Sequence, residues 1–276
     1  MRTIRTAAVA AAACVLLGGL SACGGEKKDE RTPADALKAA SAVMAKAGSA
    51  AFTLDAQDPE DGKSTAKGAM SWTGAKAMDL AFTSEDGPAR MRWVGTTLYF
   101  GGDDKDAADH DGKHWMKLGG GPATAGADTG QMGAWVDQAN PSSALDAVVA
   151  VGTLRKVGEE KVAAADTVHY QGTAPVADLV AATRQLSAKQ RKSTLEMYRK
   201  QGATSVTLDF WLNGDDEVVR HVQTAKGTKG TSTTAFVYSE LGRHAGIQAP
   251  PASDVYSLED MMKQAAGALK DEGSGS

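Results

Sequence analysis

Much of the chain beyond residue 48 alternates apolar and polar side chains with a period of two. Phe52 and Leu54 share one such face, and Val206, Leu208 and Phe210 share another. Turn-forming runs rich in Gly, Pro, Asn and Asp separate these stretches at spacings of about 8 to 12 residues. The pattern predicts antiparallel strands joined by tight turns, because alternate side chains of a strand point to the same face of its sheet.

A second kind of segment follows helical spacing instead. Thr32 and Asp35 form a capping pattern, Pro33 suits the first helical position, and Gly48 suits the stop, so a helix is expected over 33–47. Further helices are predicted over 141–151, 175–186 and 187–201, and a last one is predicted to be capped by Ser257. Strands and helices in separate runs indicate an α+β fold.

The first 22 residues have the layout of an export signal. Two arginines precede an uncharged apolar run over 7–20, which is shorter than the roughly 20 residues that span a bilayer. Leu20-Ser21-Ala22-Cys23 then reads as a lipobox, in which the small Ser21 and Ala22 fit a peptidase pocket. The Cys23 thiol would take a diacylglyceryl thioether before cleavage, with a fatty acid such as palmitate completing the anchor. The alternative is an ordinary secretory signal cut near Ala22.

Lipidation at Cys23 is favoured because this lone cysteine is followed by Gly24-Gly25 and a charged stretch. The expected layout is a lipoprotein signal peptide over 1–22, a tether over 23–31, one domain over 32–270 and a disordered tail over 271–276. The mature protein would be held on the outer face of the cell membrane by this lipid.

Composition excludes several other classes of protein. Cys14 leaves with the signal, so an acylated Cys23 leaves no thiol in the fold for a disulfide or a thiolate metal site. The whole chain has a net charge of -4, and loss of the two signal arginines brings the mature chain near -6. Its basic residues are scattered, which argues against nucleic acid as a partner. The membrane is the expected partner, and the sequence names no protein partner.

An acidic stretch over 103–114 is the most site-like cluster. Carboxylates and imidazoles can bind calcium or zinc. An EF-hand loop aligned on Gly112, however, would place Ala107 and Leu118 where acids are required. We interpret the stretch as a solvated hairpin loop that turns at Asp111-Gly112, and expect no metal. The residues concerned are Asp103, Asp104, Asp106, Asp109, His110, Asp111 and His114.

No hydrolase or other enzyme motif stands out. The chain lacks a Gly-x-Ser-x-Gly elbow and a His-Glu-x-x-His. His169, His221 and His244 are isolated in the sequence, so each is expected at a strand surface or in a satisfied hydrogen bond. We therefore expect no enzyme and no cofactor. An envelope hydrolase would need His110 and His114 to converge with acids on one cleft.

The order of elements resembles the LppX/LprG-type lipoproteins of actinobacteria (LppX, LprA, LprF and LprG) and, more distantly, the LolA/LolB-like lipoprotein carriers. Together the matching stretches span almost the whole mature chain. They are Leu98-Tyr99-Phe100 with Trp115-Met116-Lys117-Leu118, Val157-Gly158-Glu159 with Thr167-Val168-His169-Tyr170, Phe210-Trp211-Leu212-Asn213-Gly214, and Tyr238-Ser239-Glu240-Leu241-Gly242 with Ile247-Gln248-Ala249-Pro250-Pro251.

The resemblance implies a curved antiparallel sheet, an incomplete β-barrel, with helices on its concave face and an apolar cavity that holds a lipid or other amphiphile. The apolar faces of this chain could supply the lining, although each such residue would be buried in any sheet protein. The candidate lining residues are Met44, Phe52, Leu54, Trp72, Leu80, Phe82, Leu208 and Phe210. The alternative is a sensory or interaction lipoprotein that has the same fold with a filled core and an exposed patch.

Overall fold

The computed structural model describes residues 31–60, 62–74, 76–84, 87–118, 139–244, 246–257 and 261. The chain divides into two units, Met1–Glu30 and Arg31–Ser276, and every described residue belongs to the second. The predicted lipobox with Cys23, residues 119–138 and the predicted tail over 271–276 lie outside the described residues.

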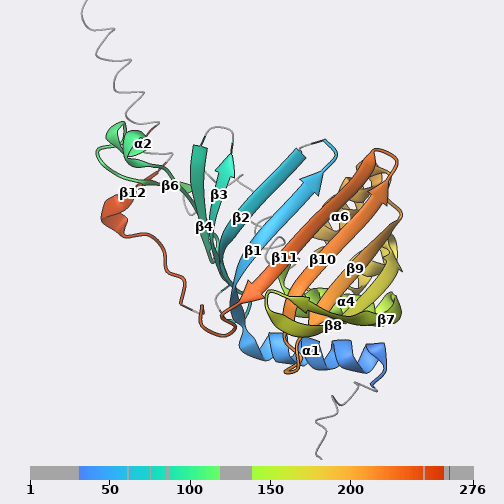
Figure 1. Cartoon of the computed structure of the whole chain (residues 1–276). Coiled ribbons are helices and arrows are strands. Elements are labelled where there is room, and N and C mark those ends of the chain that lie inside the picture. The colour runs from blue at the N-terminus through green and yellow to red at the C-terminus, as the bar shows by residue number, and fades with distance from the viewer. Residues whose placement is uncertain are drawn as a thin grey trace, which may run out of the picture. The chain divides into compact units, whose positions relative to one another are not determined.

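Along the chain, helices separate three main runs of strands (Figure 1). The strands are β1 (Ser49–Asp58), β2 (Gly62–Ser71), β3 (Ala77–Ser84), β4 (Gly87–Val94), β5 (Thr97–Gly101), β6 (Trp115–Leu118), β7 (Thr153–Val162), β8 (Ala165–Pro175), β9 (Ser205–Leu212), β10 (Val218–Gly227), β11 (Gly230–Ser239) and β12 (Val255–Ser257). The helices are α1 (Pro33–Ala47), α2 (Asp104–Ala108), α4 (Pro141–Val151), α5 (Val176–Ala182), α6 (Ala188–Gln201) and the 3-10 turn η2 (Ala252–Asp254).

The described strands form one sheet in the order β12-β6-β5-β4-β3-β2-β1-β11-β10-β9-β8-β7. Neighbours are antiparallel except β12, which runs parallel to β6. The junction of the two meanders is the pairing of β1 with β11, in which Phe52 lies opposite Tyr238 and Leu54 opposite Phe236. The sheet ends at β12 and β7 and does not close into a barrel.

Helix α1 begins and ends where its local sequence requires. The Thr32 side chain accepts a hydrogen bond from the Asp35 amide, and Gly48 takes a left-handed conformation at φ 71°. The Trp72 indole Nε1 donates to the carbonyl oxygen of Met44 at 3.0 Å, which fastens the end of the helix to the chain after β2. Helix α6 is bounded in the same way by a capping box at Ser187 and a left-handed Gly202.

Helices α4 and α6 lie behind β9–β11 in the view of Figure 1, so they cover one face of the curved sheet. α1 packs on α4, α4 on α5, and α5 on α6, while α4 also contacts β8. The apolar faces of the strands and of α1 and α4 meet in one buried core. The α+β class with an open, curved, predominantly antiparallel sheet and helices on its concave face is therefore confirmed.

One local prediction was wrong. The acidic stretch contains a short helix, α2, because Asp103 and Asp106 form a reciprocal capping box that the loop interpretation overlooked. The expected turn is nevertheless present, since Asp111 and Gly112 both have positive φ. Ser257 ends strand β12, and the helix predicted after it falls on residues that, except Met261, lie outside the described ranges.

Candidate functional site

A small pocket of about 50 Å³ lies between helices α4, α5 and α6 and the inner face of β9 and β10. It is the described space between helices and sheet in which an apolar ligand could be enclosed. Its lining is mostly aliphatic, with hydroxyl and amide groups at intervals. The lining residues are Ser143, Ala144, Ala147, Leu179, Val180, Thr183, Leu186, Thr194, Tyr198, Leu208 and Gln223.

Two polar groups of the pocket differ in how they are satisfied. The Tyr198 hydroxyl accepts a hydrogen bond from Gln223 Nε2 at 2.7 Å, and burial raises the pKa of Tyr198 to about 12. Ser143 is 3% exposed, and its Oγ has no hydrogen-bond partner in the part of the chain that the structure describes. A buried hydroxyl without a partner costs free energy. Ser143 could therefore hydrogen-bond a polar group of a ligand.

Helix α6 covers this pocket with little apolar contact of its own. Tyr198 is its one buried side chain among 14 residues, and Leu195 and Met197 are exposed. Burying an apolar side chain is worth about 1.5 to 3 kcal/mol, so a helix held mainly by one such residue can be displaced at small cost. By contrast, α4 buries most of its length in the core.

Seven of the eight residues predicted to line a cavity are buried in the core, and Phe82 is half-buried. Leu208 lines the pocket under the helices. The others pack mainly against protein side chains, as with Phe52, whose ring lies 5.8 Å from that of Phe236. Their role in lining a ligand cavity stays a prediction.

A row of ring side chains crosses the inner face of the sheet. Tyr170, Phe210, His221 and Phe236 are successive cross-strand neighbours on β8, β9, β10 and β11. His221 is 1% exposed, and neither ring nitrogen has a hydrogen-bond partner among the described residues. The expectation of a surface or satisfied histidine was therefore wrong for His221. Burial lowers the pKa of this imidazole to about 4, so it is neutral at pH 7.

The other histidines are paired. His169 Nε2 lies 2.8 Å from Asp209 Oδ1 and its ring stacks on Trp211, while His244 Nε2 lies 2.6 Å from Glu240 Oε2. The prediction of satisfied positions is confirmed for these two. Cross-strand registry creates both the His169–Asp209 and the His169–Trp211 contacts, which is why the sequence alone did not show them.

The two histidines of the acidic stretch do not converge on a shared set of acids. His114 contacts Asp104 Oδ1 through Nε2 at 3.1 Å and Asp254 Oδ1 through Nδ1 at 2.8 Å, whereas His110 stacks on Tyr256. These contacts join α2 and the loop before β6 to η2 and β12. The Asp254 hydrogen bond is the main reason why the pKa of His114 is raised. Asp254 was missed because it is 140 residues away in sequence.

Within the described ranges, no group of three or more His, Cys, Asp or Glu side chains is arranged to hold a metal ion. In the same ranges, no helix has the length and hydrophobicity needed to cross a membrane.

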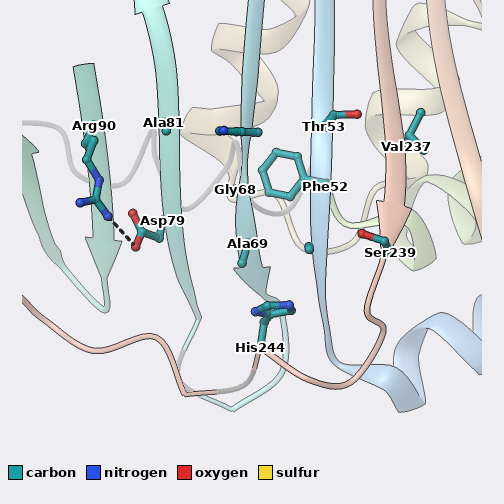
Figure 2. Close-up of a pocket in the computed structure, with 12 residues that line it drawn as sticks. Phe52, Thr53, Gly68, Ala69, Asp79, Ala81, Arg90, Val237, Ser239 and His244 are labelled. Carbon is teal, nitrogen blue, oxygen red and sulfur yellow. Dashed lines mark ion pairs between the residues drawn. The ribbon is translucent and has the colours of Figure 1, made fainter. Parts of the chain in front are cut away.

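A larger hollow, of about 530 Å³, lies on the opposite, outer face of the sheet (Figure 2). We call it the outer trough. It crosses β11, β1, β2, β3 and β4, and small side chains form most of its lining. Its residues are Ala51, Phe52, Thr53, Lys67, Gly68, Ala69, Asp79, Ala81, Arg90, Val237, Ser239 and His244. Sequence reasoning missed it because it depends on which small residues become neighbours across five strands.

No protein-family model matches the chain. It is similar to an uncharacterized 31.2 kDa protein in the rplA-rplJ intergenic region of Streptomyces griseus, with 29% identity over 198 residues that cover 71% of this chain and 65% of the relative. The chain thus spans just under two thirds of that relative. It is also similar to a candidate lipoprotein of Streptomyces coelicolor, with 24% identity over 249 residues that cover 83% of this chain and 76% of that protein.

Among solved structures, the chain is similar to the lipoprotein LppX of Mycobacterium tuberculosis, with 15% identity, a TM-score of 0.47 and coverage of 78% of this chain and 99% of LppX. It is also similar to LprF of Mycobacterium bovis, with 14% identity, a TM-score of 0.47 and coverage of 80% and 99%. Both proteins are of the LppX/LprG type that the order of elements in the sequence resembles.

Proposed function

We propose that this protein is a lipid-anchored, extracytoplasmic binding protein, and not an enzyme, that holds the apolar chain of an amphiphile between its helices and its sheet. The observation that carries the proposal is the aliphatic pocket under α6, which is lined by a Ser143 hydroxyl that has no hydrogen-bond partner among the described residues. A ligand that offers a hydroxyl, carbonyl or ester oxygen beside an apolar chain would satisfy both features.

The pocket as described is too small for a long acyl chain, so ligand entry requires α6 to move. Displacement of Tyr198 would break its hydrogen bond to Gln223 and extend the pocket over Leu208. Each methylene group that is then buried returns about 0.8 kcal/mol. Several methylenes offset the loss of one buried tyrosine and one hydrogen bond. An ordinary apolar chain on the ligand is therefore enough to offset the cost of displacing α6.

The experiment is extraction of bound lipid from Cys23→Ser protein, which is exported without an anchor of its own, followed by mass spectrometry. A co-purifying amphiphile is expected. Ala144→Trp places a large side chain in the pocket from a half-buried position and should lower the recovered lipid at least fivefold. Ala150→Trp on the exposed side of α4 is the matched control. Extracts of the parent protein that contain no lipid, or equal amounts of lipid recovered from the two variants, would contradict the proposal.

The second candidate is an interaction lipoprotein with a filled core. Two observations favour it: the space under the helices is about 50 Å³, and the outer trough is about ten times larger. The extraction experiment separates the two, because a filled core predicts clean extracts and no response to Ala144→Trp other than a change in stability.

A further inference from the structure

The outer trough carries a surplus of positive charge on a chain that is acidic as a whole. Lys67 is exposed and has no ion pair or hydrogen bond within the described part of the chain. Arg92 binds Asp79 through two nitrogens, with Nε 3.1 Å from Oδ2, while Arg90 lies 3.6 Å from the same oxygen. The Asp79 carboxylate is thus the ion-pair partner of two guanidinium groups.

Two further acids lie near the trough but outside its lining. Glu240 is paired with His244 at the end of the trough near β11, and Asp55, the next residue on this face of β1, is not part of the lining. Within the lining, Lys67 and Arg90 exceed Asp79 by one positive charge, and Arg92 beside the lining binds the same carboxylate. Such a local excess attracts anions and makes binding dependent on ionic strength.

Strand register fixes where these cations lie. Lys67 on β2 is opposite Ala81 on β3, and Ala81 is opposite Arg90 on β4, so the two cations stand at one level with a methyl group between them. Figure 2 shows Arg90 and Asp79 on one side of the trough and Thr53 and Val237 towards the other. Two strand spacings place the Lys67 and Arg90 backbones about 10 Å apart.

Arg90 is held in place by an aromatic ring. Its guanidinium lies 5.1 Å from the centroid of Trp115, which also receives Arg92 at 4.9 Å. Gly101 makes room for this ring, because a Cβ there would come within 3.0 Å of it. An ordered guanidinium loses less side-chain freedom when it binds a carboxylate than a freely rotating one does.

The dimensions suit one extended chain. Five strands at about 4.8 Å give a trough about 19 Å long, and the lining is two residue levels deep along four of them, or about 7 Å. An extended peptide of about six residues has that length. A flat membrane surface would not reach a recessed floor of alanines, and the Thr53 and Ser239 hydroxyls suit a polar backbone better than a hydrocarbon chain.

We infer that the outer trough is a docking surface for an extended acidic segment of a partner protein, whose carboxylates bind Lys67 and Arg90 while its backbone crosses the floor of Ala51, Ala69 and Ala81. Acidic side chains two positions apart lie on one face of an extended peptide, about 7 Å from each other. The flexible Lys and Arg side chains close the remaining distance. This inference is independent of ligand binding under the helices.

The experiment measures fluorescence anisotropy of a labelled hexapeptide with Glu at its second and fourth positions, binding to the full-length protein purified in detergent. Binding is expected to weaken at least tenfold when both Glu are replaced by Gln, and at least fivefold in 0.5 M salt. Lys67→Ala and Lys67→Glu should each weaken peptide binding, and the charge reversal in Lys67→Glu should have the larger effect. Lys63→Ala, on the same strand and the same face outside the trough, is the matched control.

Equal binding of the Glu and Gln peptides would overturn the inference, as would equal effects of Lys63→Ala and Lys67→Ala. Arg90→Lys keeps the charge but loses planar contact with a carboxylate and with Trp115, so binding should fall while the thermal unfolding curve stays within a few degrees. A further arm adds vesicles containing phosphatidylglycerol. Lys67-dependent vesicle binding without peptide binding would assign the trough to lipid headgroups and overturn the peptide inference.

Discussion

The ring of His221 stacks on that of Phe210 with centroids 4.6 Å apart and planes within 4° of each other. His221 also stacks on Phe236, so the imidazole lies between two phenyl rings in the core. Its neighbours across the sheet on both sides are therefore apolar, and no acid pairs with it among the described residues.

This placement makes stability sensitive to acid. The unfolded chain binds a proton at His221 near pH 6.5, whereas burial lowers the folded pKa to about 4. As the pH falls from 6.5 to 4, the unfolded chain binds the proton and the folded protein does not, so the unfolded state is stabilised. Below pH 4, His221 causes no further loss of stability. The free energy of unfolding should drop by about 3 kcal/mol across that window. Urea unfolding of His221→Phe should lack this drop and match or exceed the parent stability at pH 7.

His169→Gln is the control for that measurement, since His169 is paired with Asp209 on the outer face. An acid dependence that is unchanged in His221→Phe but absent in His169→Gln would contradict the assignment.

The His114–Asp254 contact should hold β12 against β6 in a defined pH range. The pKa of His114 is raised, chiefly by its hydrogen bond to Asp254, so its contribution is complete below the unfolded-state pKa and is lost as pH rises through the folded-state pKa. The pKa of Asp254 is lowered, chiefly by its hydrogen bond from the His114 backbone, so that contribution is lost as pH falls through its folded-state pKa. Protection of the Tyr256 amide from exchange should be greatest at pH values between the folded-state pKa of Asp254 and that of His114.

Asp254→Asn should reduce this protection more than Asp104→Asn, because Asp254 bonds both the amide and the ring of His114. Protection that is independent of pH from 4 to 9, after correction for intrinsic exchange, would contradict the prediction.

Gly172 allows α4 to approach the sheet closely. A Cβ at this position would lie 2.4 Å from Cγ2 of Val148 and 2.9 Å from Cδ2 of Leu154. Gly172→Ala should therefore destabilise the fold by about 1 to 3 kcal/mol through overpacking. Gly158→Ala, on the neighbouring strand with nothing within 4 Å, should have little effect on stability. Adding Val148→Ala to Gly172→Ala should recover part of the lost stability. Urea unfolding of the parent, the two single variants and the double variant measures this coupling.

Cys23 is predicted to anchor the protein. Cys23→Ala should shift the protein from the membrane fraction to the soluble exported fraction and abolish incorporation of labelled palmitate. Cys14→Ala should change neither, because Cys14 lies in the predicted signal peptide. A membrane-bound, labelled Cys23→Ala protein would contradict the lipobox interpretation.

Local sequence determined the elements whose boundaries depend on nearby residues. Thr32 and Gly48 bound α1, Asn140 begins α4, and Ser187 and Gly202 bound α6, because each cap forms within a few residues. Period-two alternation likewise placed Phe52, Leu208 and Phe210 on the buried face. These choices rest on backbone hydrogen bonds and side-chain direction, which a short stretch of sequence specifies.

Only the tertiary structure decided what those elements bring together. Strand order places Lys67 level with Arg90, buries His221 between Phe210 and Phe236, and carries Asp254 to His114. The same order converts Val255–Ser257 into an edge strand. Each of these outcomes depends on pairing between segments far apart in the chain, and no local pattern encodes which strands become neighbours. The fold class was therefore predictable, whereas the outer trough and, apart from Leu208, the lining of the pocket under α6 were not.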